Sequence, residues 1–441
     1  MPQPEMKVKI DPPMSQWHQG PLREQCAIAT GHQLWHWHPG ILAKYYAVDA
    51  FAQKPGGRVL NVWVNHDTVD ATRIELPVID GDRAGTRAIH LGPCDATLPT
   101  CVQPAIDPDH AVRTLTEAAE ANTLPQGVNV DRLVHAWKRA PREGSLDQQM
   151  VAVMTDMLRG HVQPFQSLLS SQLLEKPAAR SLVSHMLDDA KRCVQHFNEA
   201  VAAQPAAGIR PLLVEPHRVE LPLWALADRQ PRQRVFADLS DRKPILTLES
   251  GEPVSIPLAP RALLLTALMR AYFCELFIHG SGGGVYDQIM EQWWNAWTGI
   301  SLAPMAVVSA DVFLPFDGVP LAERKDVDRA IWFAHHLPHN VERFVTSGEA
   351  DFNLAARKNA ILTHMDDDRD RQRRRTAFRE LHDINASLAA SHPQLMANAR
   401  SGIDQAMVGL ENQRVGQKRD WCFSLYPIDR LDRLRRKIAT G

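Results

Sequence analysis

The sequence predicts an α/β protein built on a Rossmann-like parallel sheet core, with a helical insertion and a C-terminal helical coiled-coil region. Three observations predict this class. Residues 26–64 follow a strand–helix–strand order, strand-like runs return after residue 205, and the pattern beyond residue 321 is helical. We therefore assign residues 1–108 and 205–320 to the two halves of the core, 109–204 to the insertion, and 321–441 to the C-terminal region.

The first elements form a βαβ unit. Cys26–Thr30 is a short buried strand, Pro39–Gln53 is a helix with proline in its first turn, and Val59–Val64 is the next strand. Because parallel strands place ligands at their carboxyl ends, the residues after each strand should meet at one edge of the sheet. Residues 72–91 then predict a β-hairpin, with Asp80-Gly81-Asp82 as its turn.

The middle of the chain is expected to be helical and then rich in strands. Residues 109–203 show helical periodicity without a convincing strand. Residues 262–277 are apolar but interrupted by Arg270 and Glu275, which indicates one buried helix rather than a membrane span. A glycine-rich loop should follow it, and residues 306–309 should be the last strand of the sheet. The remaining short strands are expected at 211–214, 218–223, 235–238 and 245–248.

The C-terminal helices carry an apolar seam that needs a partner, either the protein's own body, such as the helix around residues 406–410, or the same helix of a second chain in a homodimer. Its residues step by three and four, as in a coiled coil: Phe378, Leu381, Ile384 and Leu388. The arginine-rich block at 366–375 has interleaved aspartates, so it indicates a solvated helix face rather than a nucleic-acid site. Residues 420–427 hold too many aromatic side chains for a free tail and should dock on the body.

Composition limits the partners of the protein. The chain has 441 residues, 44% of them hydrophobic and 23% charged, and its formal net charge of -2 provides no field that would recruit nucleic acid or an anionic membrane. We expect a cytoplasmic protein, because no secretory or membrane-spanning pattern is present. Cys94 and Cys101 should be unpaired thiols, with a disulfide or half of a metal site as the alternative.

The turn after the first strand is the first candidate site. An apolar run ends in a glycine turn, two imidazoles follow, and a proline opens a helix, whose N-terminus favours an anion. His32 and His38 could stabilise charge on a leaving phosphate, and Lys44 lies about a turn farther on. The alternative is a capped helix with structural histidines and a surface lysine. The candidate nucleotide-binding residues here are Thr30, Gly31, Gln33, Gly40 and Lys44.

Two more segments should lie at the same edge of the sheet. Glycines 282–284 permit close approach of backbone amides to a ligand, and Gly282, Gly283 and Gly284 are also assigned to the nucleotide. Asp67 is a candidate catalytic residue that could orient an amine or a magnesium ion, or only cap its turn. Neither a P-loop nor a GxGxxG pattern is present, which makes NAD unlikely as a cofactor. The candidate substrate-binding residues are His66, Asp70, Tyr286 and Asp287.

Several of these segments together resemble the cysteine-adding ligase family of bacillithiol biosynthesis (BshC). The family has Pro-Gly-Glu where this chain has Gly283-Gly284-Val285, so an acid is absent here. The resemblance implies a Rossmann-like core related to nucleotidyltransferases, a dimerising coiled coil, a nucleotide site at the Gly31 turn, and bond formation to an amino acid such as cysteine. The segments that carry it are Thr30-Gly31-His32-Gln33, His38-Pro39-Gly40, Asn65-His66-Asp67, 196–200, 260–275, Val285-Tyr286 and 304–309.

The leading functional hypothesis is therefore a nucleotide-dependent ligase. It would use ATP or ADP, with Mg²⁺ as an option, to join an amino acid to a carboxylate or sugar conjugate, and no residue set is assigned to a resident metal. A nucleotidyltransferase of the same fold is one alternative. A non-catalytic dimeric scaffold with a degenerate nucleotide site is another, and the missing acid in the glycine run favours it slightly.

Overall fold

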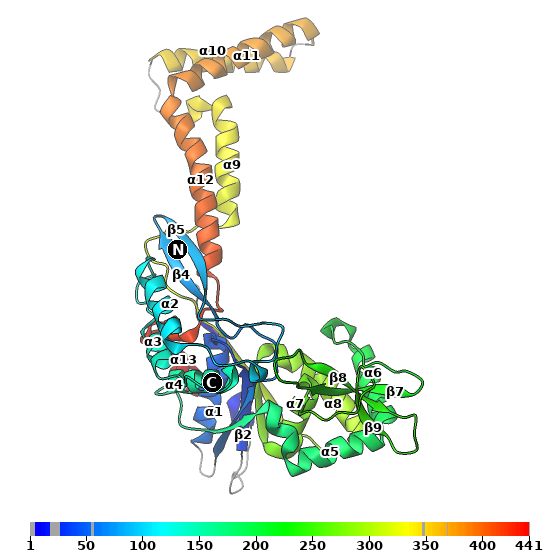
Figure 1. The fold of residues 1–441 in the computed structure, drawn as a ribbon. Helices are drawn as coiled ribbons and strands as arrows, with labels where there is room; N and C mark the ends of the chain where they lie inside the picture. The colour runs from blue at the N-terminus through cyan, green and yellow to red at the C-terminus, as the bar shows by residue number, and fades with distance from the viewer. Residues whose placement is uncertain (1–4, 18–26, 54–56, 346–348, 368, 441) are drawn as a thin grey trace. The chain divides into compact units, whose positions relative to one another are not determined.

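The computed structural model describes residues 5–17, 27–53, 57–345, 349–367 and 369–440 (Figure 1). Its main sheet has six strands, of which five run parallel and the edge strand β1 runs antiparallel to its neighbour. The predicted α/β class with a parallel core is confirmed. In spatial order the strands are β1 (Lys7–Asp11), β12 (Met305–Asp311), β11 (Leu276–His279), β2 (Ala27–Gln33), β3 (Arg58–Val64) and β6 (Gln166–Leu169).

The order of the strands creates a switch point at the centre of the sheet. The chain leaves β2 through helix α1 (Pro39–Ala52) to reach β3 on one side, and leaves β11 through helix α8 (Ser281–Thr298) to reach β12 on the other. Two neighbouring parallel strands whose connections diverge leave a crevice at their carboxyl ends. The fold therefore places the ends of β2 and β11 side by side, as their pairing of Ile278 with Thr30 shows.

Helices α1 and α8 pack against different neighbouring helices. Helix α1 is apolar around most of its circumference because it packs both on the strands and on α13 (Ile428–Ala439). Helix α8 packs against α6 (Ala190–Ala203) and α7 (Ala262–Leu268). Its three tryptophans are buried in that layer, and two of them, Trp293 and Trp297, stack with ring centroids 5.8 Å apart.

A second sheet has four antiparallel strands. Strands were predicted at 218–223, 235–238 and 245–248, and the structure confirms all three. Residues 211–214 form no strand, because only Val214 bridges to Val219 there. In spatial order the strands are β10 (Leu258–Pro260), β7 (Arg218–Ala225), β8 (Gln233–Asp238) and β9 (Ile245–Leu248).

The insertion is mostly helical, but the prediction that it contains no strand is wrong. Residues Gln166–Leu169 form β6, which pairs with β3 at the edge of the main sheet. Four residues without apolar–polar alternation leave no periodic signal, so only the pairing partner defines this strand. The helices are α2 (Pro108–Glu120), α3 (Asp131–Lys138), α4 (Leu146–Leu158), α5 (Pro177–Asp188) and α6.

The predicted helix over 262–277 is also wrong in its second half. Helix α7 ends at Leu268, a π turn spans Met269–Phe273, and β11 follows. A short apolar run is compatible with either a buried helix or a buried parallel strand, so its periodicity could not decide between them. The expected glycine-rich loop is instead the first turn of α8, with Gly280 as its N-cap.

The remaining predictions near the sheet hold. The hairpin is formed by β4 (Arg73–Asp80) and β5 (Arg83–His90). The segment at 420–427 is docked, because Tyr426 is buried and the backbone N–H of Phe423 donates to the carbonyl of Trp37 at 2.6 Å. Short 3-10 turns occupy Met14–Gln16, Thr100–Val102, Ser170–Glu175, Pro205–Ala207, Leu337–His339, Val341–Arg343 and Phe423–Leu425.

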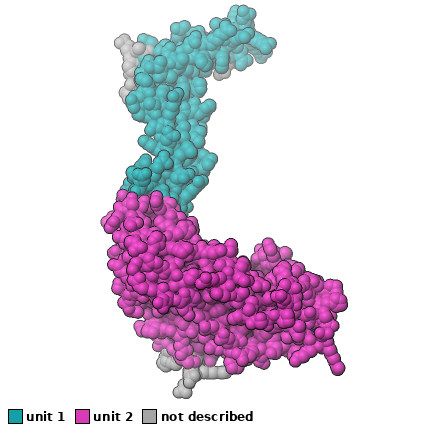
Figure 2. Space-filling view, in the orientation of Figure 1, with its two compact units in different colours: residues 1–2, 79–85, 316–417 teal, residues 3–78, 86–315, 418–441 magenta. Residues whose placement is uncertain are grey.

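The chain divides into two compact units (Figure 2). The smaller contains residues 79–85 and 316–417, and the larger contains residues 3–78, 86–315 and 418–441. In the smaller unit Ile384 and Leu388 of the predicted seam are buried against Val341, but Phe378 is 63% exposed. Its helices are α9 (Arg324–His336), α10 (Glu349–Asp367), α11 (Arg371–Ser391) and α12 (Pro393–Gly416).

Two further properties concern the whole described chain. In the parts that the structure describes, no helix has the length and apolar character needed to cross a bilayer. Cys94 and Cys101 are free thiols, as predicted. Cys26, the first residue of the predicted first strand, lies outside the described residues.

Candidate functional site

A cavity of about 650 Å³ opens at the switch point, among the carboxyl ends of the parallel strands and one end of the second sheet. Eleven of the predicted site residues line it: Gly31, His32, Gln33, His38, Gly40, Lys44, His66, Asp67, Gly282, Gly283 and Tyr286. The three segments expected to meet at one sheet edge therefore border one space. This volume lies within the range typical of sites for small molecules and cofactors.

Glycine 31 lets β2 approach β3 closely. A Cβ at this position would overlap the side chain and carbonyl oxygen of Val62. Thr30, just before it, does not line the cavity, and its hydroxyl donates to the carbonyl of Ile278 at 2.9 Å. The side chain of Thr30 therefore ties β2 to β11 and does not face the cavity where the nucleotide was predicted.

The N-terminus of α1 is already satisfied by its own residues. The ring Nδ1 of His38 accepts from the backbone N–H of Gly40 at 3.0 Å, and the N–H groups of Ile41 and Leu42 donate to the carbonyl of His38. Burial lowers the pKa of His38 to about 4, which keeps its ring neutral and able to accept. His38 thus caps the helix, as the structural alternative proposed.

The N-terminus of α8 offers the free amides instead. The N–H groups of Gly283 and Gly284 donate to the carbonyl of Gly280 at 3.1 and 3.4 Å. Within the described residues, the N–H groups of Ser281 and Gly282 have no hydrogen-bond acceptor. The first turn of a helix with unpaired amides is a binding site for anions. Unpaired amides of the kind predicted at the start of α1 are therefore found at the start of α8.

Lys44 is the most unusual group in the cavity. It is 2% exposed, and its ammonium donates to the carbonyl of Gly31 at 2.6 Å. Its Cδ lies 3.9 Å from the place of a Cβ on Gly280, so the side chain passes beside the cap of α8. Burial lowers the pKa of Lys44 to about 7, and no carboxylate among the described residues forms an ion pair with it.

Two imidazole rings lie close enough to the Lys44 ammonium to interact with its charge. Burial lowers the pKa values of His32 and His279, and the charge of Lys44 lowers both further. Atom Nδ1 of His32 is buried with no hydrogen-bond partner among the described residues. This end of the cavity therefore has basic side chains and helix amides, but no acid paired with Lys44.

Asp67 faces the cavity but is already bound. Its carboxylate accepts from Arg232 at 2.9 Å, from the Gln33 amide at 3.3 Å and from the backbone N–H of Thr68 at 2.9 Å. The capping alternative is thus realised, and the carboxylate also orients an arginine. Its neighbour His66 is 3% exposed, and its Nδ1 lies 2.6 Å from the hydroxyl of Ser170.

Three of the predicted site residues lie away from the cavity, in addition to Thr30. The carboxylate of Asp70 accepts a hydrogen bond from the hydroxyl of Thr72 at 2.9 Å, and it lies 3.0 Å from Nδ1 of His90. Gly284 packs toward Val307. Asp287 is 1% exposed and pairs with Arg270 at 3.2 Å behind the cavity wall. In the described chain, no three His, Cys, Asp or Glu side chains converge to hold a metal ion.

Sequence reasoning missed the part of the lining that comes from the second sheet. Trp224 lies between two guanidinium groups, 4.6 Å from that of Arg232 and 4.0 Å from that of Arg261. Arg261 also pairs with buried Glu220 at 2.6 Å. No short motif marks these residues, because they are brought together only by strand pairing. His279 carried one signal, an imidazole directly after an apolar strand-like run.

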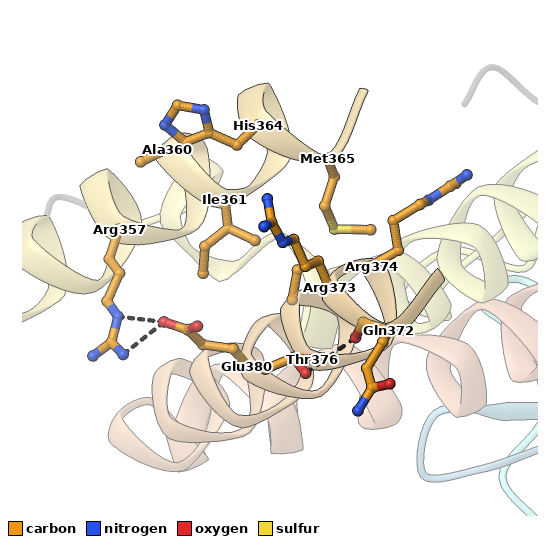
Figure 3. A pocket seen from close by; sticks show the side chains of 11 residues that line it. Arg357, Ala360, Ile361, His364, Met365, Gln372, Arg373, Arg374, Thr376 and Glu380 are labelled. Carbon is orange, nitrogen blue, oxygen red and sulfur yellow. Dashed lines mark hydrogen bonds and ion pairs between the residues drawn. The ribbon is translucent and has the colours of Figure 1, made fainter. Parts of the chain in front are cut away.

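A separate hollow of about 470 Å³ lies in the smaller unit, between α10 and α11 (Figure 3). Its floor includes Ile361 and Met365, and Arg357 forms an ion pair with Glu380 at its edge. The predicted site residues lie at the cavity of the switch point and not in this hollow, so that cavity is the candidate functional site.

Comparison with known proteins adds little to this geometry. No family model and no curated protein matches the chain. Among solved structures, Mycobacterium tuberculosis methionyl-tRNA synthetase bound by methionyl-adenylate matches over 94% of this chain and 91% of its own, with 10% sequence identity and a TM-score of 0.24. A likeness this slight carries no function from that enzyme to this chain.

Proposed function

We propose that this protein is a nucleotide-dependent ligase that holds the phosphates of ATP or ADP between Lys44 and the first turn of α8. The carrying observation is the buried Lys44 ammonium, which has no carboxylate partner among the described residues. A buried charge without a counter-ion is costly, and a bound anion would relieve that cost. The amides of Ser281 and Gly282 lie at the adjacent helix end and would donate to the same anion.

The composition of the cavity supports a second reactant. The end formed by the second sheet presents a flat indole, Trp224, flanked by Arg232 and Arg261. Planar guanidinium groups hydrogen-bond carboxylates in two-pronged geometry, and Arg232 or Arg261 would exchange its present carboxylate partner, Asp67 or Glu220, for that of a substrate. An acid or sugar conjugate would lie there, and a nucleotide phosphate would lie beside Lys44. Such a pair of substrates is what a ligase that activates a carboxylate requires.

The resemblance to the cysteine-adding ligases of bacillithiol biosynthesis supports an amino acid as the third reactant. Gln33 and Asp67 both line the cavity and are hydrogen-bonded to each other at 3.3 Å, and an amine would approach them there. Asp67 already pairs with Arg232, so it would orient the amine only after that ion pair shifts. Release of AMP or ADP together with a new amide would support the ligase, whereas a stable nucleotide adduct would support the nucleotidyltransferase.

Calorimetric titration with ATP, ADP and pyrophosphate tests the nucleotide site directly. We expect Lys44→Gln to weaken binding at least tenfold, because a hydrogen-bonded charge–phosphate contact is worth about 1.5–3 kcal/mol. Lys138→Gln is the matched control, since Lys138 is exposed on α3. Equal affinities of the wild type and Lys44→Gln would contradict the proposed site, and a wild type that binds no nucleotide would leave the dimeric scaffold as the better reading.

The two histidines of the first turn are expected to behave differently. His32→Ala should weaken nucleotide binding and leave the fold intact, because the ring has no structural hydrogen bond through Nδ1. His38→Ala should lower the melting temperature as well, because it removes the cap of α1, worth about 1 kcal/mol. Thermal denaturation alongside calorimetry separates the two effects. Equal loss of stability in both variants would show that His32 is structural.

A further inference from the structure

We propose that His279 and Asp287 form a proton-sharing pair for the anion bound at the start of α8, in which His279 contacts the anion and Asp287 is its positioning residue. This inference rests on the proposed nucleotide site and adds a specific role to it. Both residues come from one strand–helix connection: His279 is the last residue of β11, and Asp287 lies on α8.

The first support is the position of the His279 ring. Its Nδ1 and Cε1 atoms occupy the space that a Cβ on Gly283 would fill, so the ring lies against the first turn of α8. Only glycine at 283 leaves room for it there. The ring also borders the cavity. An anion bound to the free amides of this turn would therefore meet the Nδ1 edge of the imidazole.

The second support is the polar chain behind the ring. Atom Nε2 of His279 lies 3.6 Å from a carboxylate oxygen of Asp287. The other carboxylate oxygen of Asp287 pairs with Arg270 at 3.2 Å, and Arg270 is fixed by the carbonyl of Ala303 at 2.8 Å. Asp287 and Arg270 are 1% and 4% exposed. A carboxyl group held in this way fixes the orientation of the imidazole beside it.

The third support is the charge around the pair. Lys44 from α1 and Arg270 from the π turn face His279 and disfavour its protonation, and the His32 ring on β2 lies close enough to interact with it. On α8, Asp287 and Glu291 supply the negative charge, and Glu291 also pairs with Arg270. Burial lowers the pKa of His279 to about 3 and raises that of Asp287 to about 7, so in the free protein the His279 ring is neutral and the proton of the pair lies on Asp287. A bound phosphate adds negative charge beside Nδ1 and so favours the imidazolium.

The chemical consequence is a site that gains a proton where negative charge collects. An imidazolium at this position would neutralise charge on a phosphate group as it departs, which is an electrostatic contribution to catalysis. The pair needs no external oxidant, reductant or metal for this role, since only a proton moves between solvent, Asp287 and His279.

Histidine side-chain NMR on the full-length chain tests the proposal. The protein is labelled with ¹⁵N-histidine and titrated with pH, both free and with saturating pyrophosphate, and His279→Gln identifies the signals. We expect pyrophosphate to raise the apparent pKa of His279 by about three units, from about 3 toward neutrality, because only a rise of that size protonates the ring near pH 7. His90 is the internal control, because it pairs with Asp70 outside the cavity and should not respond.

Two variants decide the role of the pair. Asp287→Asn should abolish the rise in the pKa of His279 while pyrophosphate still binds. If that variant does not fold, Gly283→Ala provides the test, because it displaces the ring without touching Asp287 and should also abolish the response. Pyrophosphate that binds while the signals of His279 stay unchanged would overturn the pair but leave the nucleotide site standing. Absence of any pyrophosphate binding to the wild type would overturn both.

Discussion

The buried ammonium of Lys44 is expected to contribute little to the free energy of unfolding, because no carboxylate among the described residues pairs with it. It makes one hydrogen bond to the carbonyl of Gly31, and its pKa falls to about 7 because of burial. The folded chain therefore binds fewer protons than the unfolded chain between about pH 7 and pH 10. By linkage, the free energy of unfolding of the wild type should rise with pH across that window. The penalty is largest at pH 7 and below.

Lys44→Met should therefore stabilise the protein. We expect a gain of about 1–3 kcal/mol at pH 6–7, since removal of the buried charge outweighs the lost hydrogen bond, which is worth about 1 kcal/mol. The gain should shrink as pH rises above 7 and level off above about pH 10.5, where the wild-type lysine is mostly neutral in both states. Urea denaturation at several pH values measures this. A variant that is less stable than the wild type at pH 6 would show that the charge is compensated within the fold.

Anion binding should also take up a proton. At pH 8 the free Lys44 is mostly neutral, while a bound phosphate raises its pKa and restores its charge. Calorimetric titration with ATP in buffers of different ionisation enthalpy should give an uptake that approaches one proton per site at that pH. Lys44→Met should reduce it to near zero. The same uptake in the variant would assign the proton to another group.

The positions of individual site residues could be predicted from the sequence better than the contacts of their side chains. The position of Gly31, Lys44 and Asp67 around one cavity followed from the βαβ order, because carboxyl ends of parallel strands share an edge. Whether Asp67 is free or paired could not follow, since its partner Arg232 is far away in sequence and reaches it only through tertiary folding. The same holds for Lys44, whose burial depends on β11 lying next to β2.

At the scale of elements, the connection from strand β11 to helix α8 provides the unpaired amides that line the cavity. The sequence was interpreted as a continuing helix and a loop, because its apolar run does not distinguish helix from buried strand. The consequence was to place the anion at α1, whose amides are in fact capped by His38. A π turn at 269–273 ends α7, and the residues that follow it form a strand of the sheet. The composition of this segment does not predict the turn.

Two adjacent glycines of α8 provide a sharp test of this connection. A Cβ on Gly282 would meet no atom within 4 Å, whereas one on Gly283 would overlap the ring of His279. Gly282→Ala should be neutral or stabilise the protein by up to about 1 kcal/mol, through the higher helix propensity of alanine. Gly283→Ala should be destabilising because His279 must move. Melting temperatures measure both, and equal effects would show that the ring of His279 moves freely.

At the scale of the whole molecule, the sheet core was predictable and the assembly is still a prediction. The order of elements predicted a parallel sheet with its ligand edge at the carboxyl ends of the strands, and the unpredicted strand β11, paired with β2, creates the switch point there. The predicted seam on α11 is partly buried within the smaller unit and partly exposed to solvent. Leu388 is fully buried within the smaller unit, whereas Phe378 is 63% exposed. Only the exposed part of the seam is free to pack against a second copy.

We propose that the protein forms a homodimer through the exposed apolar side chains of α10 and α11, of which Phe352 and Phe378 are 67% and 63% exposed. Phe378→Glu should then convert a dimer into a monomer in sedimentation without changing the circular dichroism spectrum, because the side chain supports no intramolecular core. Leu388→Glu is the contrasting variant: it places a charge against Val341 and should lower the stability of the smaller unit by several kcal/mol. A wild type that sediments as a monomer at high concentration would rule out the dimer. A Phe378→Glu variant that remains dimeric would move the interface elsewhere on the molecule.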